Sequence, residues 1–211
     1  AVGGCLRRGS AGPDAERESR PGGCGHLEED AAKNNHKEEE TLIDYNRSGT
    51  PLAELVTEPD IRNVEDAKLF MQEIRRIVRY VSASSADMEK GQMRLEPNIS
   101  VSLNSNSKDL PKYKVEVKNI NSFKFVEKAI NFETARQQEL LDKNERPAQE
   151  TRGWNEDKGK TFSQRSKEDA QDYRYFPDPD LPVLIIDPEW IERLEAEIPE
   201  LPGHKYKRFQ E

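Results

Sequence analysis

MRLEPNISVSL, residues 93–103, alternates between apolar and polar side chains along almost its whole length. Since successive side chains of a strand point to opposite faces, this stretch predicts a strand with one apolar and one polar face. The apolar positions are Met93, Leu95, Pro97, Ile99, Val101 and Leu103, and the polar positions are Arg94, Glu96, Asn98, Ser100 and Ser102. The segment YKVEVKN, residues 113–119, alternates in the same way and predicts a strand that can pair with the first.

Further strands are predicted on both sides of this pair. Residues 41–46 and 51–58 predict two strands joined by a turn, and residues 148–154 and 160–166 predict two more. Strands therefore come in adjacent pairs with helices inserted between the pairs. This order predicts an α+β fold with a mainly antiparallel sheet, and it argues against a doubly wound parallel sheet.

Three helices are predicted from their start signals and from apolar residues at helical spacing. The first follows Asn63 and the second follows Ser122, both of which are good N-cap residues. The third starts at Asp187 and Pro188, because proline is well tolerated in the first turn of a helix. The residues of the third helix that we expect to face inward are Trp190, Ile191 and Leu194.

Composition limits the classes of function. The 211 residues are 33% hydrophobic and 35% charged, and the formal net charge is −8. This charge argues against nucleic-acid binding by the whole surface, although a local basic groove remains compatible with it. No apolar run is long enough to span a membrane, and two cysteines outside any metal-ligand spacing predict a cytoplasmic protein, or an organellar one in a eukaryote.

The chain divides into three predicted parts. Residues 1–25 are rich in glycine and lack aromatic residues, so we expect them to be disordered. Residues 26–186 are expected to form the main domain, and residues 187–211 a helical segment that leads out of it.

The polar faces of the two alternating strands carry the candidate chemistry. The side chains expected to converge there are Arg94, Glu96, Asn98, Glu116 and Lys118. Carboxylates beside lysine and arginine suit a magnesium-phosphate site, since magnesium prefers oxygen ligands and the cations neutralise phosphate. The alternative is a solvated face on which the same residues form weak cross-strand salt bridges.

Two acidic stretches favour the magnesium-phosphate interpretation. HLEED, residues 26–30, gathers acidic side chains at the start of the expected main domain. Glu54 lies within the otherwise apolar PLAELV, where a buried carboxylate would need a cation or a metal. No glycine-rich phosphate loop is present, so any nucleotide must be held in another way.

Several linked motifs resemble those of one protein family. They are LIDYNRSGTPLAELVTEPDIR, MEKGQMRLEPNISVSL, VEVKNINSFKFVEKAI, QETRGW and RSKEDAQDYRYFPDPDLP, which occur in this order. Together they resemble the catalytic domain shared by the B and E subunits of tRNA-dependent amidotransferases, from about His26 to the C-terminus. The resemblance implies a glutamine-synthetase or guanido-kinase type of cradle domain, with an antiparallel sheet and helices on one side.

The resemblance also implies an activity and its partners. Enzymes of this family use ATP and magnesium to phosphorylate the side-chain carboxylate of a misacylated Glu-tRNA(Gln) or Asp-tRNA(Asn). Ammonia, which the amidase (the A subunit) releases from glutamine, then displaces the phosphate. The expected partners are this amidase, a small C subunit, the misacylated tRNA and the ammonia that the amidase delivers, and no membrane is involved.

Site residues follow from the family's motifs, position by position. The implied metal ligands are Glu29, Glu54 and Glu96, which together with Lys118 form the expected catalytic set. The residues implied to contact the nucleotide phosphates are Arg94, Lys118 and Glu116. The residues implied to lie near the substrate are Asn119, Ser122, Arg174 and Tyr175.

The chain departs from the family's pattern in places. Glu96 stands where aspartate is common, and Pro97 lies within a predicted strand, which suggests an edge or a bulge. A Glu-x-His strand that helps to hold the metal has no counterpart upstream of HLEED, and we expect the C-terminal tRNA-gripping domains to be missing too. The alternatives are therefore an amidotransferase catalytic domain, a catalytically incomplete fragment that only binds the amidase or tRNA, and, more weakly, a magnesium-dependent nuclease.

Overall fold

The computed structural model describes residues 2–7, 24–29, 33–37, 40–103, 110–166 and 185–211. The strands are β1 (Val2–Arg7), β2 (Cys24–Glu29), β3 (Lys33–His36), β4 (Thr41–Asp44), β5 (Pro51–Val56), β6 (Pro97–Ser102), β7 (Val115–Lys118), β8 (Glu150–Asn155) and β9 (Lys160–Ser166). The helices are α1 (Val64–Tyr80), α2 (Phe123–Asp142), α3 (Pro188–Glu197) and α4 (Pro202–Gln210). The order of elements confirms a mixed fold of helices and strands. The cradle type stays a prediction.

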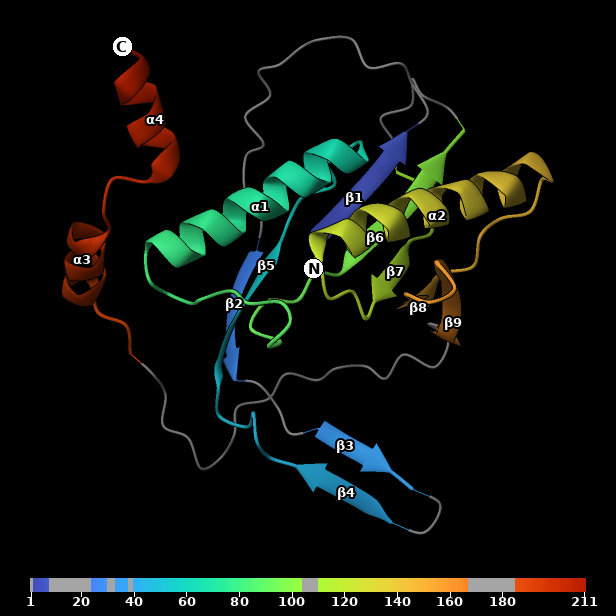
Figure 1. The fold of residues 1–211 in the computed structure, drawn as a ribbon, viewed down its shortest axis with the longest axis horizontal. Coiled ribbons are helices and arrows are strands. Elements are labelled where there is room, and N and C mark those ends of the chain that lie inside the picture. The colour runs from blue at the N-terminus through green and yellow to red at the C-terminus, as the bar shows by residue number, and fades with distance from the viewer. Residues whose placement is uncertain (1, 8–23, 30–32, 38–39, 104–109, 167–184) are drawn as a thin grey trace.

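The main sheet has five strands in the order β1-β6-β7-β8-β9, and α1 and α2 lie side by side across one of its faces (Figure 1). The pairs β6–β7 and β8–β9 are antiparallel, whereas β1–β6 and β7–β8 are parallel. The predicted mainly antiparallel sheet is therefore wrong for this sheet, which is mixed. The reason is α2, which connects β7 to β8 as a crossover and so returns the chain in the same direction.

Two smaller antiparallel ribbons lie between β1 and β6 in the sequence. β2 pairs with β5, and β3 pairs with β4. The predicted strands at 41–46 and 51–58 are confirmed as β4 and β5, and the turn between them contains a hydrogen bond from Ser48 N to Tyr45 O of 3.0 Å. The two strands do not pair with each other.

The predicted central pair of strands is confirmed, but it is shorter than the alternating pattern. β6 begins at Pro97, and its register with β7 sets Asn98 opposite Glu116 and Ile99 opposite Val115. Because Pro97 is the first residue of β6 and β6 lies between β1 and β7, the expected edge or bulge at this proline is wrong. A first strand residue tolerates the missing backbone donor.

Caps define where the two long helices begin and end. Asn63 Oδ1 accepts a hydrogen bond from Asp66 N at 2.7 Å, and Ser122 Oγ accepts one from Phe125 N at 3.2 Å, which confirms both predicted N-caps. Asn144, at φ 60°, follows the last turn of α2 and donates its N–H to Leu141 O at 2.9 Å. This left-handed C-terminal turn directs the chain back toward β8.

The core lies between the helix layer and the main sheet. Its apolar side chains include Ala67 and Met71 of α1, Val126 of α2, and Val115 and Val117 of β7. Burying each fully enclosed aliphatic side chain contributes roughly 1.5–3 kcal/mol to folding. The odd-numbered residues of β7 therefore face the helices, and its even-numbered residues lie on the opposite face, which we call the polar face.

The ends of the chain depart from the sequence-based expectations. Within residues 1–25, Val2–Arg7 forms β1 and residues 24–25 begin β2, whereas residues 8–23 lie outside the described residues. β1 adds to the free edge of β6 through backbone hydrogen bonds, which composition does not predict. The division at residues 25 and 186 stays a prediction.

The third predicted helix is confirmed as α3, capped by Asp187 Oδ1, which accepts a hydrogen bond from Trp190 N at 2.6 Å. Its expected inward-facing side is wrong. Ile191 and Leu194 are about half exposed, and no residue of α3 is buried among the described parts of the chain. None of the helices that the structure describes is long and apolar enough to cross a membrane.

Candidate functional site

Four side chains gather on the polar face where β6 and β7 meet, and we call them the polar row: Glu96, Asn98, Glu116 and Lys118. Lys118 Nζ lies 3.3 Å from Glu96 Oε2 and 3.8 Å from Glu116 Oε1. The side chains of Lys118 and Glu96 are 33% and 28% exposed, so the row is accessible to a ligand. The structure thus brings these predicted residues together, with one cation between two carboxylates.

A residue of β8 contacts the polar row through a hydrogen bond. Thr151 lies opposite Glu116 in the parallel register and donates a hydrogen bond from Oγ1 to Glu116 Oε2 at 3.0 Å. Thr151 is almost fully buried, so its hydroxyl holds one oxygen of Glu116 in place. Sequence analysis missed Thr151, although it lies within the QETRGW motif.

Gly153, two residues further along β8, lies opposite Lys118 in the register. A Cβ atom at this position would lie 2.6 Å from Cζ of Phe162 and 2.7 Å from Nε2 of Gln164, far closer than real contacts allow. Glycine leaves room for the ends of these two side chains of β9, which pass directly over its backbone and would have to shift for any larger residue. The ring of Phe162 remains 42% exposed beside the row.

Asn98 contributes a polar atom that has no partner in the part of the chain that the structure describes. Its Oδ1 is one of three buried side-chain nitrogen or oxygen atoms of the described residues that have no hydrogen-bond partner. A buried amide oxygen without a partner is costly, and such atoms call for an explanation such as an ion or a ligand. Asn98 lies opposite Glu116, so the row offers carboxylate and amide oxygens, which are the donors that magnesium prefers.

The predicted metal ligands are only partly placed. Glu54 is half-buried on β5 opposite His26, and Glu29 ends β2 opposite Pro51, but the side chain of Glu29 lies outside the described atoms. Among the described side chains, no group of three His, Cys, Asp or Glu residues is assembled for a metal ion. The set Glu29, Glu54 and Glu96 therefore stays a prediction.

The remaining predicted site residues lie around the row or outside the described residues. Arg94 is exposed three residues before β6, and Asn119 directly follows β7 in the left-handed region at φ 61°. Asparagine tolerates this conformation better than most residues, so it can end the strand sharply. Ser122 uses its hydroxyl oxygen as the N-cap of α2. Arg174 and Tyr175 lie outside the described residues.

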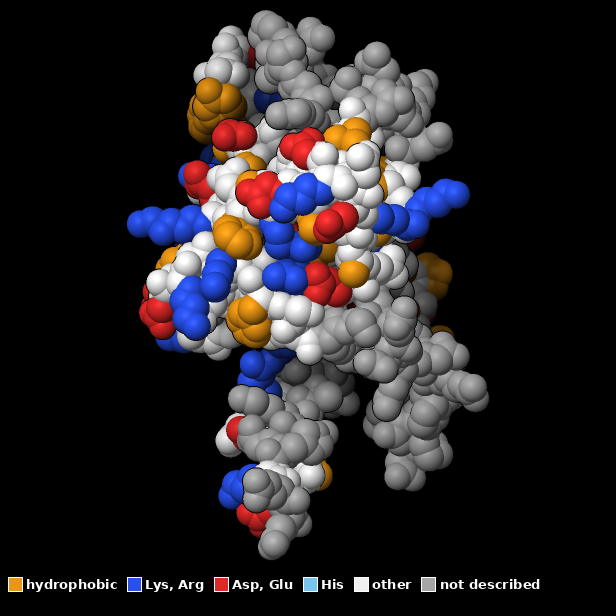
Figure 2. All heavy atoms as spheres, turned by 90° about the vertical axis from the view of Figure 1, so that its right-hand side faces the viewer, with side chains coloured by type: hydrophobic (Ala, Val, Ile, Leu, Met, Phe, Trp, Pro, Cys, Tyr) orange, Lys and Arg blue, Asp and Glu red, His pale blue; other side chains and the backbone are white. Residues whose placement is uncertain are grey.

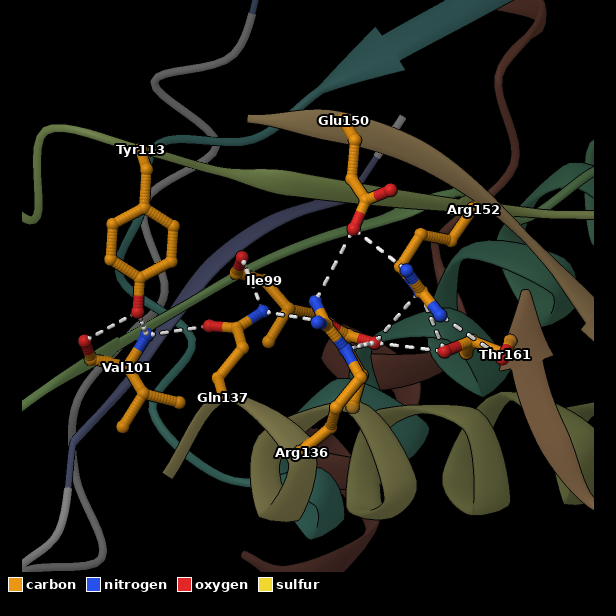
Figure 3. A network of polar contacts seen from close by, with 9 residues as sticks. Ile99, Val101, Tyr113, Arg136, Gln137, Glu150, Arg152 and Thr161 are labelled. Carbon is orange, nitrogen blue, oxygen red and sulfur yellow. Dashed lines mark hydrogen bonds and ion pairs between the residues drawn. The ribbon is translucent and has the colours of Figure 1, made fainter. Parts of the chain in front are cut away.

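A second polar cluster, on the helix side of the sheet, was missed by sequence analysis (Figure 3). Glu133 of α2 is fully buried, and its Oε2 accepts a hydrogen bond from Thr161 Oγ1 at 2.9 Å. Arg136 donates from Nη2 to Glu133 Oε1 at 2.6 Å, and Arg152 donates from Nη1 to Glu150 Oε1 at 2.7 Å. We call these five residues the buried network.

Gln137 extends this cluster to β6. Its Nε2 donates to Glu133 Oε1 at 2.9 Å and to Ile99 O at 3.3 Å, and its Oε1 accepts from Val101 N at 3.1 Å. Tyr113 completes the contact by donating its hydroxyl to Val101 O at 2.9 Å. The buried network and Gln137 together fasten α2 to β6, β8 and β9.

Arg136 of the buried network stays positively charged across the ordinary pH range. Burial alone would lower the pKa of Arg136, but the hydrogen bond and charge of Glu133 outweigh it, and the net effect raises the pKa. Because the pKa of Arg136 is raised, the contribution of its protonation to stability is present below the ordinary arginine pKa and is lost only as the pH rises through the raised value. Arg136 thus acts in the buried network as a permanent positive charge.

On the side of the molecule formed by the end of α2 and the β8–β9 hairpin, acidic and basic side chains are interspersed (Figure 2). Neither sign of charge dominates there.

Comparisons with known proteins agree on one family. A sequence model of the GatB/GatE catalytic domain matches residues 24–192. Among similar curated proteins is the aspartyl/glutamyl-tRNA(Asn/Gln) amidotransferase B subunit of Persephonella marina, which is 50% identical over 184 residues, 87% of this chain and 38% of the relative. The proteins of the same name from Thermosipho melanesiensis and Thermus thermophilus are 51% and 45% identical, over 88% and 97% of the chain and 40% and 43% of the relatives. The chain thus spans about two fifths of the length of these relatives.

Proposed function

Because the chain belongs to the GatB/GatE catalytic-domain family, we propose that it supplies the ATP-dependent activation step of a tRNA-dependent amidotransferase. The relatives are named as B subunits of enzymes acting on aspartyl- or glutamyl-tRNA(Asn/Gln), which supports a role within a multi-subunit complex. The partners that we propose are the amidase that forms the A subunit, a small C subunit, and the misacylated tRNA, in the cytoplasm or in an organelle. The fold would then be the glutamine-synthetase or guanido-kinase type of cradle.

The proposed reaction has two steps. The γ-phosphoryl group of ATP is transferred to a side-chain carboxylate oxygen of the esterified Glu or Asp, which gives an acyl phosphate and ADP. Ammonia then attacks the acyl carbon, and phosphate leaves as the amide forms. The protein's task in such a transfer is to position the groups and to stabilise charge.

The observation that carries the proposal is the polar row, in which Asn98 Oδ1 has no partner among the residues that the structure describes. Lys118 is held between Glu96 and Glu116, so its charge is fixed where an incoming phosphate could take over part of the pairing. Thr151 fixes the orientation of Glu116 before any substrate arrives. A pre-arranged group stabilises developing charge without a reorganisation cost during the reaction.

The same residues suit a magnesium ion. The carboxylate of Glu96 is accessible, and Asn98 Oδ1 is a buried oxygen without a partner among the described residues. We propose Glu96 as a ligand, with Glu29 and Glu54 as the other carboxylates. When bound, magnesium would neutralise charge on the phosphate oxygens.

The test is Glu96→Gln in the full-length protein, assembled with its partner subunits. The change keeps the size of the side chain and removes one negative charge, so magnesium affinity and ATP-dependent amidation should fall by roughly tenfold or more. Glutamine hydrolysis by the partner should persist.

A matched control is Glu127→Gln. Glu127 Oε2 forms a similar pair with Lys68 Nζ at 3.0 Å, but on the helix layer. Amidation at the wild-type rate in Glu96→Gln, or an equal loss in Glu127→Gln, would refute the assignment of the polar row.

A further inference from the structure

A groove on the helix layer carries a concentration of positive charge, and we call it the arginine groove. It lies between the C-terminal half of α1 and the start of α2, and this open depression has a volume of about 540 Å³. Its lining residues are Gln72, Arg75, Arg76, Arg79, Tyr80 and Phe123. Three guanidinium groups thus share one groove in a protein whose formal net charge is −8.

The three arginines are held to different degrees. Arg75 stacks over the ring of Phe123, 5.8 Å from its centroid, and donates from Nε to Ala86 O at 3.1 Å. Arg76 Nη2 lies 2.8 Å from Glu73 Oε2, and the side chain of Arg76 is exposed whereas that of Glu73 is partly buried. For Arg79, in the last turn of α1, the described part of the chain records no ion pair. The groove therefore has more positive charge than its neighbours neutralise.

Flat rings accompany these cations. Tyr80 is 41% exposed, and the ring of Phe123 is half-buried beneath Arg75. Aromatic rings and guanidinium planes are the surfaces on which unpaired bases stack, while arginine forms paired hydrogen bonds with phosphate oxygens.

α4 continues this surface, because it lies next to α1, near the C-terminal end of that helix in Figure 1. Its sequence PGHKYKRFQ places basic and aromatic residues together, and Tyr206 and Phe209 are 65% and 71% exposed. Arg208 lies 4.7 Å from the centroid of the Phe209 ring. Basic side chains interleaved with exposed rings are typical of surfaces that bind RNA.

We propose that the arginine groove and α4 bind the phosphate backbone of the tRNA substrate. This inference rests on the proposed function, which supplies the tRNA, and adds the place of contact. The groove lies on the helix layer, whereas the polar row lies on the opposite face of the sheet. The arginine groove therefore contacts the tRNA away from the end that reacts, and it contributes to the affinity for the tRNA.

The experiment measures the dissociation constant of the full-length protein for a transcript of uncharged tRNA(Gln) over a series of salt concentrations. Neither ATP nor glutamine is present, so binding is separated from catalysis. The test variant is Arg79→Glu, and the matched control is Lys143→Glu. Both residues lie at the C-terminal end of a long helix, so both changes carry a similar helix-dipole cost.

Arg79→Glu should raise the dissociation constant roughly threefold to tenfold and reduce the slope of log affinity against log salt by about 0.7–0.9. Tyr80→Ala should weaken binding without changing that slope. Lys143→Glu should bind like the wild type. The proposal would be overturned if Arg79→Glu left both the affinity and the slope unchanged. It would also be overturned if Arg79→Glu bound RNA normally but no longer assembled with the partner subunits. If the wild-type protein bound RNA through the groove but did not catalyse amidation, only the proposed function would be refuted.

Discussion

The two faces of the main sheet use polar residues in opposite ways. On the helix side, the fully buried Glu133 and Gln137 direct their polar atoms at other parts of the same chain. On the polar face, Lys118 makes two longer ion contacts, and Asn98 Oδ1 has no partner among the described residues. Both faces carry similar residue types, so composition alone does not separate a structural network from a candidate site.

The difference lies in how completely the hydrogen-bonding capacity is used. A buried network in which every group is paired fixes one arrangement of the elements that it joins. Accessible groups that are held in place but only partly paired retain the capacity to bind something else. From this comparison we expect the buried network to determine stability and the polar row to determine activity.

Glu133→Ala should have the largest effect on stability. It removes the carboxylate shared by Arg136 and Thr161 and leaves buried positive charge uncompensated. The free energy of unfolding should fall by about 3–5 kcal/mol, measured by urea denaturation. The control is Glu127→Ala on the same helix, whose partly exposed pair with Lys68 is worth no more than about 1 kcal/mol. Similar losses in both variants would remove the distinction between the two kinds of pair.

Gly153→Ala should have an intermediate effect, because the new methyl group meets the ring of Phe162. Overpacking of this kind costs roughly 1–3 kcal/mol, seen as a lower thermal midpoint. The double variant with Phe162→Ala should recover part of the loss, since it removes the colliding ring and leaves only the flexible end of Gln164 in the way. If the double variant is less stable than Gly153→Ala, the close approach of Phe162 is not the cause.

Much of the local structure could be predicted from the sequence, because its causes are local. The alternation around Asn98 and Glu116 predicted a polar face on two pairing strands, and the side chains of Asn63 and Ser122 predicted the helix starts. The parallel pairing of β7 with β8 could not be predicted from strand adjacency. It depends on where α2 packs, which is a property of the whole fold.

The sequence contains a pattern that predicts the buried network. In α2 the buried residues Val126, Ala129 and Ile130 are followed at helical spacing by Glu133 and Gln137, which continue the same stripe. A charged residue on an apolar stripe predicts a buried partner, and arginine is the usual one. The prediction of an inward-facing side for α3 was wrong for the opposite reason. Periodicity shows that a helix has an apolar side, but it does not show whether another element covers that side.

Of these changes, Thr151→Val should have the smallest effect on stability. It tests most directly whether the polar row differs in function from the buried network. Valine keeps the shape of the side chain but removes the hydroxyl that donates to Glu116 Oε2. The cost in unfolding free energy should be about 1 kcal/mol, whereas ATP-dependent amidation by the complete complex should fall several-fold, because Glu116 is no longer held in one orientation. Thr151→Ser keeps the donor, so it should restore most of the activity even if it is no more stable than the valine variant. Activity that instead follows stability across the two variants would mean that Thr151 belongs functionally with the buried network, and that the polar row is not held in place for a ligand.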